Sequence, residues 1–455
     1  MSPRAPFKAY DVRGVVGKDL TEPVMERIGA AFAAIVAKGG PVVVGRDARA
    51  SSPAFAAALA RGLQAGGSDV LDIGLCGTEE VYFATDHLGA AGGIMVTASH
   101  NPPGDNGLKM VRSGARPLDR DSGLAEIEEM VLGPDPAPRA ARPGELEPRD
   151  IRGAYVEKLL GFTHPEKLAP LHILVNAGNG AAGPTFDALA EGLQAAGAPL
   201  RFTRYLFTPD PTFPNGVPNP ILPENHAQTA DALRAAGADF GVAWDGDFDR
   251  CFFFDHTGAF IDGAYIVGLL AAAVLRETPG ETVVYDPRVV LNTLDIIGAA
   301  GGRGVQAKTG HSFMKSVMRA ESAAYGGEMS AHHYFRDFMF CDSGMIPVLK
   351  VAELLSAQQV PLAELVAARA RAFPVSGERN FSPADPDAAI ARVEARFAPE
   401  AEARDDSDGM SLRFATWRFN LRRSNTENLV RLNVESIADA PLVKAKVAEI
   451  ATLLA

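Results

Sequence analysis

Short apolar runs alternate with segments of helical periodicity along most of the chain. The apolar runs at 42–44, 70–73 and 94–97 predict buried strands. Between them, apolar residues at helical spacing predict helices over 21–38 and from residue 52 onward. Because strands that alternate with helices usually pair in parallel, this pattern predicts a largely parallel sheet covered by helices.

The alternation of strands and helices begins again twice further along the chain. Apolar runs at 173–176 and 240–244 predict a second α/β unit. A run at 283–285 and a helix over 312–319 predict a third. The stretch 132–148 is dense in proline, alanine and charge, which is typical of a connector between the first two units.

The pattern changes after about residue 370. Trp417, Phe419 and Leu421 alternate with polar residues, which predicts an antiparallel strand with one buried face. We therefore predict an α/β fold of three tandem α/β domains with mixed, mainly parallel sheets, followed by an α+β domain with an antiparallel sheet. The predicted domains cover 1–150, 151–254, 255–370 and 371–455.

Composition excludes several function classes. The 455 residues are 47% hydrophobic and 22% charged, which is enough apolar material for several cores. The formal net charge of −12 repels nucleic-acid phosphates and anionic lipids, so we expect neither nucleic acid nor a membrane as a partner. The longest apolar run, 264–275, is too short to cross a bilayer, and the N-terminus lacks the apolar segment of a signal peptide. We expect a soluble cytoplasmic protein, and the sequence leaves its oligomeric state open.

A serine loop follows the strand predicted at 94–97. Ser99 would lie at the carboxyl end of this strand, which is where open α/β sheets bind their ligands. Its hydroxyl can act as a nucleophile or carry a phosphate. A turn that only introduces Pro102 and Pro103 explains the same residues equally well.

Three aspartates lie between two apolar runs. Asp245, Asp247 and Asp249 place three like charges within five positions, which is unfavourable beside a core unless a cation or hydrogen bonds compensate them. Carboxylate oxygens suit Mg²⁺, whereas an EF-hand calcium loop requires Gly and Glu where Arg250 and His256 stand. The alternative is a solvated acidic turn.

Three further segments are candidates for ligand binding. The segment 178–183, GNGAAG, has the GxGxxG pattern of a dinucleotide site, but no acidic residue lies between Glu191 and Asp210, where that site needs one. We therefore favour packing at a helix N-terminus. The polar segment 327–333 suits sugar hydroxyls, and the turn 422–426 has the donors to hold a phosphate.

Taken together, six segments in order along the chain resemble the α-D-phosphohexomutase superfamily. They span nearly the whole chain and are AYDVRG (9–14), TASHNPPGDNGLKM (97–110), DGDFDR (245–250), KTGHSF (308–313), GEMSAHHYF (327–335) and RRSNTENLVRL (422–432). DGDFDR in place of the commoner DGDGDR, with DPR at 286–288, is most similar to bacterial members that act on mannose phosphates. The resemblance implies four domains around a central cleft, each contributing one loop.

The resemblance also implies a role for each matching residue. Ser99 would be the phosphoserine, and Asp245, Asp247 and Asp249 would hold one Mg²⁺ against its phosphate. The residues around the transferred phosphoryl group would be Tyr10, Arg13, Lys109 and Arg250, with Lys109 and His332 as candidate general acid and base. The remaining substrate contacts would be Glu328, Ser330 and His332 to sugar hydroxyls, Arg288 and His311 along the cleft, and Arg422, Ser424, Asn425 and Thr426 to the phosphate that does not react.

The implied activity moves phosphate between O1 and O6 of a hexose, with a hexose 1,6-bisphosphate as intermediate and activator. We expect mannose phosphates as substrates, and glucose phosphates, alone or in addition, as the alternative. Phe248 and Ala331 stand where glycine is commoner in the superfamily, which leaves the preference between these sugars open. Remoter alternatives are an aspartyl-phosphate phosphatase, a nicotinamide dehydrogenase and a phosphosugar-binding protein without catalysis.

Overall fold

The computed structural model describes residues 6–8, 10–135, 137–423 and 429–455 of the chain. The chain folds into two compact units. The first comprises Met1–Phe260 with His332–Gln358, and the second comprises Ile261–Ala331 with Gln359–Ala455. Within the described residues, no helix is long and apolar enough to cross a membrane.

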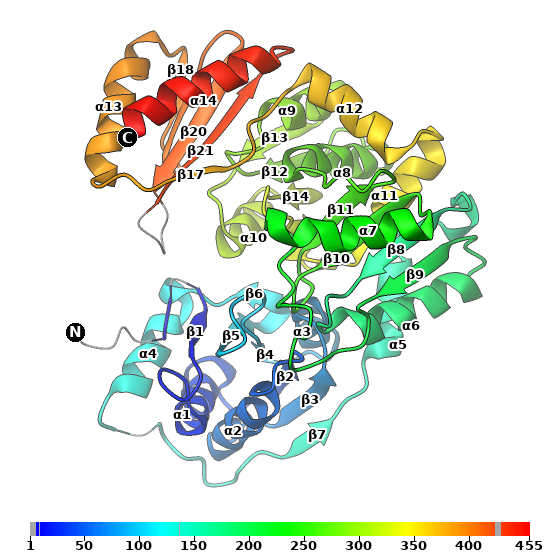
Figure 1. The fold of residues 1–455 in the computed structure, drawn as a ribbon. Helices are drawn as coiled ribbons and strands as arrows, with labels where there is room; N and C mark the ends of the chain where they lie inside the picture. The colour runs from blue at the N-terminus through cyan, green and yellow to red at the C-terminus, as the bar shows by residue number, and fades with distance from the viewer. Residues whose placement is uncertain (1–5, 9, 136, 424–428) are drawn as a thin grey trace. The chain divides into compact units, whose positions relative to one another are not determined.

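A mixed sheet opens the first unit (Figure 1). Its strands are β1 (Val12–Val15), β2 (Val42–Arg46), β3 (Val70–Leu75), β4 (Gly92–Val96), β5 (Asp105–Arg112), β6 (Arg116–Pro117) and β7 (Leu146–Pro148), in the order β1-β5-β4-β2-β3-β7 with β6 beside β5. Strand β2 is parallel to β3 and β4, whereas β5 is antiparallel to β1 and β4. The predicted parallel core is therefore confirmed, with antiparallel strands added at one side.

Helices α1 (Glu22–Phe32) and α2 (Ser52–Ala65) lie against each other on this sheet (Figure 1). Two glycines allow the close approach: a Cβ on Gly29 would lie 2.2 Å from the carbonyl oxygen of Leu59, and one on Gly62 would lie 2.0 Å from that of Glu26. One apolar face of each helix, with Ile28 on α1 and Leu59 on α2, is buried with residues of β2 and β4 in one core. Helices α3 (Thr78–His87) and α4 (Leu124–Leu132) complete this part.

The stretch 132–148 is predicted to be a connector, but its last three residues form a strand. Residues Leu146–Pro148 form β7, which pairs in parallel with β3. The sequence pattern does not reveal this strand because it lies at the sheet edge, where Leu146 is 45% exposed and no apolar run is needed.

A second sheet follows in the same unit. Its strands are β8 (His172–Asn176), β9 (Arg201–Tyr205), β10 (Phe240–Trp244) and β11 (Cys251–Asp255), and its helices are α5 (Arg152–Leu160), α6 (Ala182–Ala195) and α7 (His226–Ala236). Strand β8 is parallel to β9 and β10, and β11 returns antiparallel to β10. The first unit also contains β15 (His333–Phe335), β16 (Cys341–Asp342) and the buried helix α11 (Ile346–Gln358).

The second unit begins with a further α/β arrangement. Strand β12 (Thr282–Tyr285) pairs in parallel with β13 (Arg303–Gln306) and β14 (Tyr325–Gly327). The helices are α8 (Gly263–Glu277), α9 (Leu291–Ala299), α10 (His311–Ala320) and α12 (Leu362–Ala372).

The C-terminal part of this unit has an antiparallel sheet in the order β17-β21-β20-β19-β18. The elements are β17 (Arg379–Phe381), α13 (Pro386–Phe397), β18 (Ala403–Asp405), β19 (Met410–Arg413), β20 (Trp417–Arg423), β21 (Val430–Ser436) and α14 (Ala440–Leu454). The antiparallel strand is confirmed, but the prediction of one buried face is wrong because Arg418 and Asn420 are also buried. Both side chains find polar partners inside the protein: Arg418 pairs with Glu435, and Asn420 Nδ2 donates to the carbonyl oxygen of Asp408 at 2.9 Å.

Candidate active site

Ser99 lies on the loop that leaves β4, at the carboxyl end of the parallel strands. It is buried, and its φ of 51° is in the left-handed region that non-glycine residues rarely adopt. The Ser99 hydroxyl donates to Asp245 Oδ2 at 2.6 Å, and the Ser99 N–H donates to Thr97 Oγ1 at 2.8 Å. The structure therefore presents the serine hydroxyl directly to the aspartate segment that follows β10.

Arg49 holds the shape of this serine loop, although it is not among the site residues predicted from the sequence. Its guanidinium donates to four backbone carbonyl oxygens, those of Ser99, Asn101, Pro102 and Asp105, at 2.7–3.0 Å. Arg49 is 2% exposed and also pairs with Asp47. The sequence does contain a sign of this role. Asp47 and Arg49 come directly after the buried strand β2, and the carboxyl ends of parallel strands form the ligand-binding edge of the sheet.

The acidic loop, residues 245–250, lies between β10 and β11. Asp245, Asp247 and Asp249 are at most 2% exposed. The Lys109 ammonium, on β5, donates to Asp247 Oδ2 at 2.7 Å and also to Asp249 Oδ2. Arg250 Nε donates to Asp245 Oδ2 at 2.8 Å. Two cations thus face three buried carboxylates.

The donor set of the acidic loop fits a hard divalent cation. One oxygen of each aspartate lies within 4.8 Å of the others. Asp247 Oδ1 and Asp249 Oδ1 are buried and accept no hydrogen bond. A buried carboxylate oxygen without a donor is costly, and a metal ion would supply the missing partner.

Burial and charge act against each other on these side chains. Burial acts to lower the pKa of Lys109, but the charges of Asp247 and Asp249 outweigh it and raise the pKa. Burial acts to raise the pKa of Asp247, but the Lys109 ammonium outweighs it and holds the pKa below its usual range. Asp249 shows the opposite result, because burial and the charge of Asp247 both raise its pKa. Lys109 is therefore held as a cation at neutral pH.

The first unit holds three other predicted site residues, and two of them contact these loops. Arg13, on β1, donates to Asn101 Oδ1 at 2.6 Å, which ties it to the serine loop. His332 Nε2 lies 3.8 Å from Asp249 Oδ1. Tyr10 is half-buried and lies two residues before β1. The structure thus brings Arg13 to the serine loop and His332 to the acidic loop.

Arg288 and Glu328 lie close together in the second unit. Arg288 Nη2 donates to Asp286 Oδ2 at 2.6 Å and lies 4.0 Å from Glu328 Oε1. Glu328, which is 1% exposed, accepts from the Gly310 N–H at 2.7 Å. Two other predicted residues are half-buried in this unit: His311 begins α10, and Ser330 lies after β14.

Arg422 belongs to a group of charged side chains of which only Arg288 and Arg422 are predicted from the sequence. We name it the arginine cluster: Arg288, Arg422 and Arg431 around Glu378. Glu378 accepts from Arg422 at 3.2 Å and from Arg431 at 3.2 Å, and Arg288 Nη1 lies 3.6 Å from it. Partial burial acts to raise the pKa of Glu378, but the three guanidinium groups outweigh it and lower the pKa. The predicted phosphate-binding residues Ser424, Asn425 and Thr426 lie outside the described residues.

The glycines of 178–183 serve packing at the start of α6. A Cβ on Gly183 would lie 1.9 Å from the carbonyl oxygen of Phe207, and one on Gly180 would lie 2.9 Å from that of Gly246. This agrees with the helix-packing interpretation and gives no support to a dinucleotide site.

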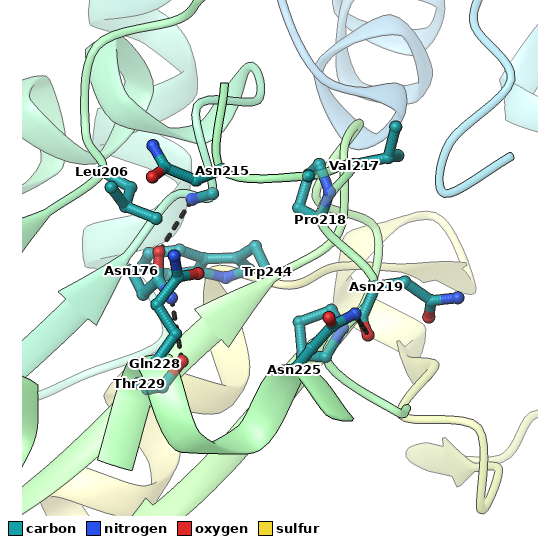
Figure 2. A pocket seen from close by; sticks show the side chains of 13 residues that line it. Asn176, Leu206, Asn215, Val217, Pro218, Asn219, Asn225, Gln228, Thr229 and Trp244 are labelled. Carbon is teal, nitrogen blue, oxygen red and sulfur yellow. Dashed lines mark hydrogen bonds between the residues drawn. The ribbon is translucent and has the colours of Figure 1, made fainter. Parts of the chain in front are cut away.

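A polar pocket lies at the carboxyl ends of β8 and β10, directly before the acidic loop (Figure 2). Its amide side chains are those of Asn176, Asn215, Asn219, Asn225 and Gln228. Asn176 is held in place, because its Nδ2 donates to Thr229 Oγ1 at 2.8 Å and its Oδ1 accepts from the Gly178 N–H (Figure 2). The cavity volume is about 30 Å³.

Family models match four consecutive parts of the chain. They are described as phosphoglucomutase/phosphomannomutase alpha/beta/alpha domain I at residues 4–136, domain II at 153–258, domain III at 262–373 and the C-terminal domain at 378–453. The chain belongs to the phosphoglucomutase/phosphomannomutase family. Within this family, a phosphomannomutase of Salmonella typhimurium is 55% identical over 450 residues, which cover 98% of both chains.

Two further members of the family are similar along almost their whole length. A Xanthomonas campestris protein named phosphohexose mutases is 54% identical over 449 residues, or 98% of both chains. The crystal structure of a family protein from Burkholderia thailandensis has a TM-score of 0.86 at 32% identity and covers 98% of this chain and 96% of that one. These findings confirm the superfamily, the fold class and the isomerase class expected from the sequence.

Proposed function

We propose that this chain is a phosphomannomutase that interconverts mannose 1-phosphate and mannose 6-phosphate. Ser99 would carry the exchanged phosphate, and a hexose 1,6-bisphosphate would be the intermediate and activator. The observation that carries the proposal is the 2.6 Å hydrogen bond from the Ser99 hydroxyl to Asp245, within a buried set of carboxylates that fits a cation. The 55% identity to the Salmonella phosphomannomutase over 98% of both chains supports the choice of reaction.

The proposed reaction has two phosphoryl transfers. In the first, O6 of mannose 1-phosphate attacks the phosphorus on Ser99: the P–O6 bond forms, the P–Oγ bond breaks with its electron pair going to Oγ, and the O6 proton passes to a base. The bisphosphate then turns round. In the second, Ser99 Oγ attacks the phosphorus on O1: the P–Oγ bond forms, the P–O1 bond breaks, and O1 takes up a proton. Ser99 is phosphorylated again, and mannose 6-phosphate leaves.

The residues around Ser99 suit these steps. Asp245 accepts from the Ser99 hydroxyl, which orients Oγ toward the incoming phosphorus. We propose that Lys109, Arg250 and Arg13 stabilise the charge on the phosphoryl oxygens, with Tyr10 beside them. Because Lys109 is held as a cation, it cannot accept a proton. We therefore propose His332 as the base.

One Mg²⁺ would complete this centre. We propose that Asp245, Asp247 and Asp249 hold it together with the phosphate on Ser99, with bare oxygens on Asp247 and Asp249 as two of the ligand atoms. When bound, the ion supplies positive charge for the transition state of phosphoryl transfer.

The second unit would bind the rest of the substrate. We propose that Glu328 and Ser330, with His332 of the first unit, contact sugar hydroxyls, and that Arg288 and His311 line the site. Arg422 would hold the phosphate that does not react, together with Ser424, Asn425 and Thr426. The three guanidinium groups gathered around Glu378 support an anion site there.

The preference between sugars is the finer part of the proposal. Mannose and glucose differ only in the direction of the C2 hydroxyl, so we expect mannose phosphate to be preferred by about 10- to 200-fold in kcat/KM, the range for a small steric difference. Activity on both sugars is the second candidate function, and the name phosphohexose mutases of the Xanthomonas relative favours it.

The test compares mannose 1-phosphate and glucose 1-phosphate in coupled assays, side by side, with the wild type and Ser99→Ala. We expect mutase activity with both sugars, higher with mannose, and a loss on the order of 10⁵-fold or more for Ser99→Ala, as for removal of a covalent nucleophile. Peptide mapping of freshly purified protein should place phosphate on Ser99. Phosphate on an aspartate would instead favour the phosphatase alternative.

The domain boundaries are a separate proposal. We propose divisions near residues 150, 254 and 370, and the family-model matches, which end at 136, 258 and 373, are compatible with them. Residue 254 lies in β11 and residue 370 in α12, so limited proteolysis should cut first near residue 150, and at the other two divisions only beyond the ends of these elements.

A further inference from the structure

Thr78, the first residue of α3, contacts Asp247 of the acidic loop although 169 positions separate them in the sequence. Its hydroxyl donates to Asp247 Oδ2 at 2.6 Å, and its backbone N–H donates to the carbonyl oxygen of Asp247 at 3.0 Å. Both residues are completely buried. The side chain and the backbone of Asp247 are therefore held by the same residue of α3.

The hydrogen bond from Thr78 determines which oxygen of Asp247 is available. Asp247 Oδ2 accepts from both Thr78 and Lys109, whereas Asp247 Oδ1 is buried and accepts no hydrogen bond. Two donors on Oδ2 fix the rotation of the carboxylate, so that Oδ1 keeps its lone pairs for another partner. A cation bound by the acidic loop would meet Asp247 in this orientation.

The neighbouring residues hold the loop at the same place. The ring of Phe248 fills the space beside Gly77: a Cβ on Gly77 would lie 2.2, 2.3 and 2.6 Å from three ring carbons. Phe248 is completely buried and has a φ of 45°, in the left-handed region. The contact of Phe248 with Gly77 and that of Asp247 with Thr78 therefore pin consecutive residues of the acidic loop to consecutive residues at the start of α3.

We propose that Thr78 is a positioning residue that orients Asp247 for a divalent cation. It acts through Asp247 and needs no contact with the substrate. The inference rests on the proposed function only in that the acidic loop binds such a cation. Donors to the far oxygen of a ligating carboxylate orient it for the metal, and loss of such a partner typically weakens metal binding by about 10- to 100-fold.

The test measures binding of Mn²⁺ to the full chain by electron paramagnetic resonance, which detects the ion directly and does not depend on turnover. Thr78→Val removes the hydroxyl and keeps the shape, and we expect its Kd for Mn²⁺ to rise by about 10- to 100-fold. Thr78→Ser keeps the hydroxyl, and we expect its Kd to stay within about threefold of the wild type. The Mg²⁺ concentration for half-maximal activity should follow the same order.

A matched control lies on the same helix. Thr85 is also completely buried, but its hydroxyl donates to the carbonyl oxygen of Val81 at 2.7 Å, away from the acidic loop. Thr85→Val should therefore leave the Kd for Mn²⁺ unchanged. If Thr78→Val fails to fold, Thr78→Ala and Thr78→Ser form a second pair that differs only in the hydroxyl.

The outcomes separate this inference from the proposed function. If the wild type binds Mn²⁺ and Thr78→Val binds it as tightly, the positioning role is overturned while the proposed function stands. An equal loss in Thr85→Val would also overturn it, because the effect would then come from the helix rather than from Asp247. If the wild type does not bind Mn²⁺ at all, the metal site of the proposed function fails, and this inference fails with it.

Discussion

The acidic loop crowds three carboxylates into one turn of the chain, whereas the arginine cluster collects its guanidinium groups from distant segments. The aspartates of the acidic loop are at most 2% exposed. In the arginine cluster, the side chains of Arg288, Arg422 and Arg431 are 5%, 9% and 24% exposed. The aspartates of the first region are thus shielded from water, while the second region contacts water mainly through Arg431 and Glu378.

This difference in hydration predicts a division of labour. Charges interact more strongly where water is excluded, so the acidic loop is suited to stabilise charge that develops during the reaction. Partly hydrated arginines pair more weakly with anions, which suits a phosphate that must be bound and released. We therefore expect changes in the acidic loop to affect kcat and changes in the arginine cluster to affect KM.

Between these two regions, the largest effect is expected for Asp247→Asn. The substitution removes a buried charge from the acidic loop, and we expect kcat to fall by about 10²- to 10³-fold, as for loss of one preorganised charge-stabilising group. KM for mannose 1-phosphate should change by less than about threefold. Steady-state kinetics at saturating Mg²⁺ measure both constants.

Asp255→Asn is the control for this prediction. Asp255 is a buried aspartate at the far end of β11, where it accepts from Thr257 and Ala259. Its loss should lower the melting temperature without a comparable loss of kcat. A rise in KM for Asp247→Asn with kcat intact would contradict the division of labour.

Arg422→Gln is expected to have the second largest effect, this time on KM. A hydrogen bond to a charged group contributes about 1.5–3 kcal/mol, so we expect KM to rise by about 10- to 100-fold while kcat changes little. The adjacent Arg423 supplies a matched control, because its side chain is 50% exposed and pairs with Asp387 at the surface. Arg423→Gln should leave both constants near their wild-type values, and an equal effect of both variants would contradict the role of the cluster.

The two regions also differ in how well the sequence predicts them. DGDFDR places Asp245, Asp247 and Asp249 together in one turn, so neighbours in the sequence remain neighbours in the fold. Glu378 was not predicted, because only the pairing of β17 with β21 and of β21 with β20 brings it to Arg422 and Arg431. The same holds for Thr78, whose partner lies 169 positions away.

The secondary structure also shows that sequence patterns predict local features and miss those that depend on distant partners. Strands and helices with a buried face, such as β2, β10 and α2, follow from the hydrophobic pattern alone. The pattern gave no sign of the exposed edge strand β7, nor of the buried polar face of β20. Arg418 on that face is buried only because Glu435 on β21 pairs with it, and such a partner is not visible in local periodicity.

Glu79 shows how a carboxylate beside the acidic loop behaves without a cation. It is completely buried and accepts from Tyr155 Oη and from the Gly344 N–H. Burial raises its pKa from 4.5 to about 8, despite these hydrogen bonds. The folded protein therefore binds one more proton than the unfolded chain between about pH 4.5 and 8, and stability falls as the pH rises through this window.

Glu79→Gln removes this titration, and we expect a moderate effect on stability. The wild type should lose up to about 1.4 kcal/mol per pH unit across the window relative to the variant, whose side chain stays neutral. Thermal melts of both proteins from pH 5.5 to 7.5 test this, because all other titrating groups are common to the two. A difference in melting temperature that stays constant with pH would show that Glu79 does not change its charge in this range.

The smallest expected effect comes from salt, which should act on the arginine cluster and spare the acidic loop. Raising KCl from about 0.05 to 0.5 M shortens the screening length from about 14 to 4 Å, which weakens the attraction between a phosphate and partly hydrated arginines. We expect KM to rise by about two- to fivefold, while kcat at saturating Mg²⁺ changes by less than about twofold.

Arg422→Gln sharpens the salt experiment. If screening acts at the arginine cluster, the variant has one fewer charge to screen, and its KM should respond less to KCl than that of the wild type. An equal response would place the effect elsewhere on the protein surface. A fall in kcat with salt would show that screening also acts at the acidic loop, which contradicts the division of labour argued from its burial.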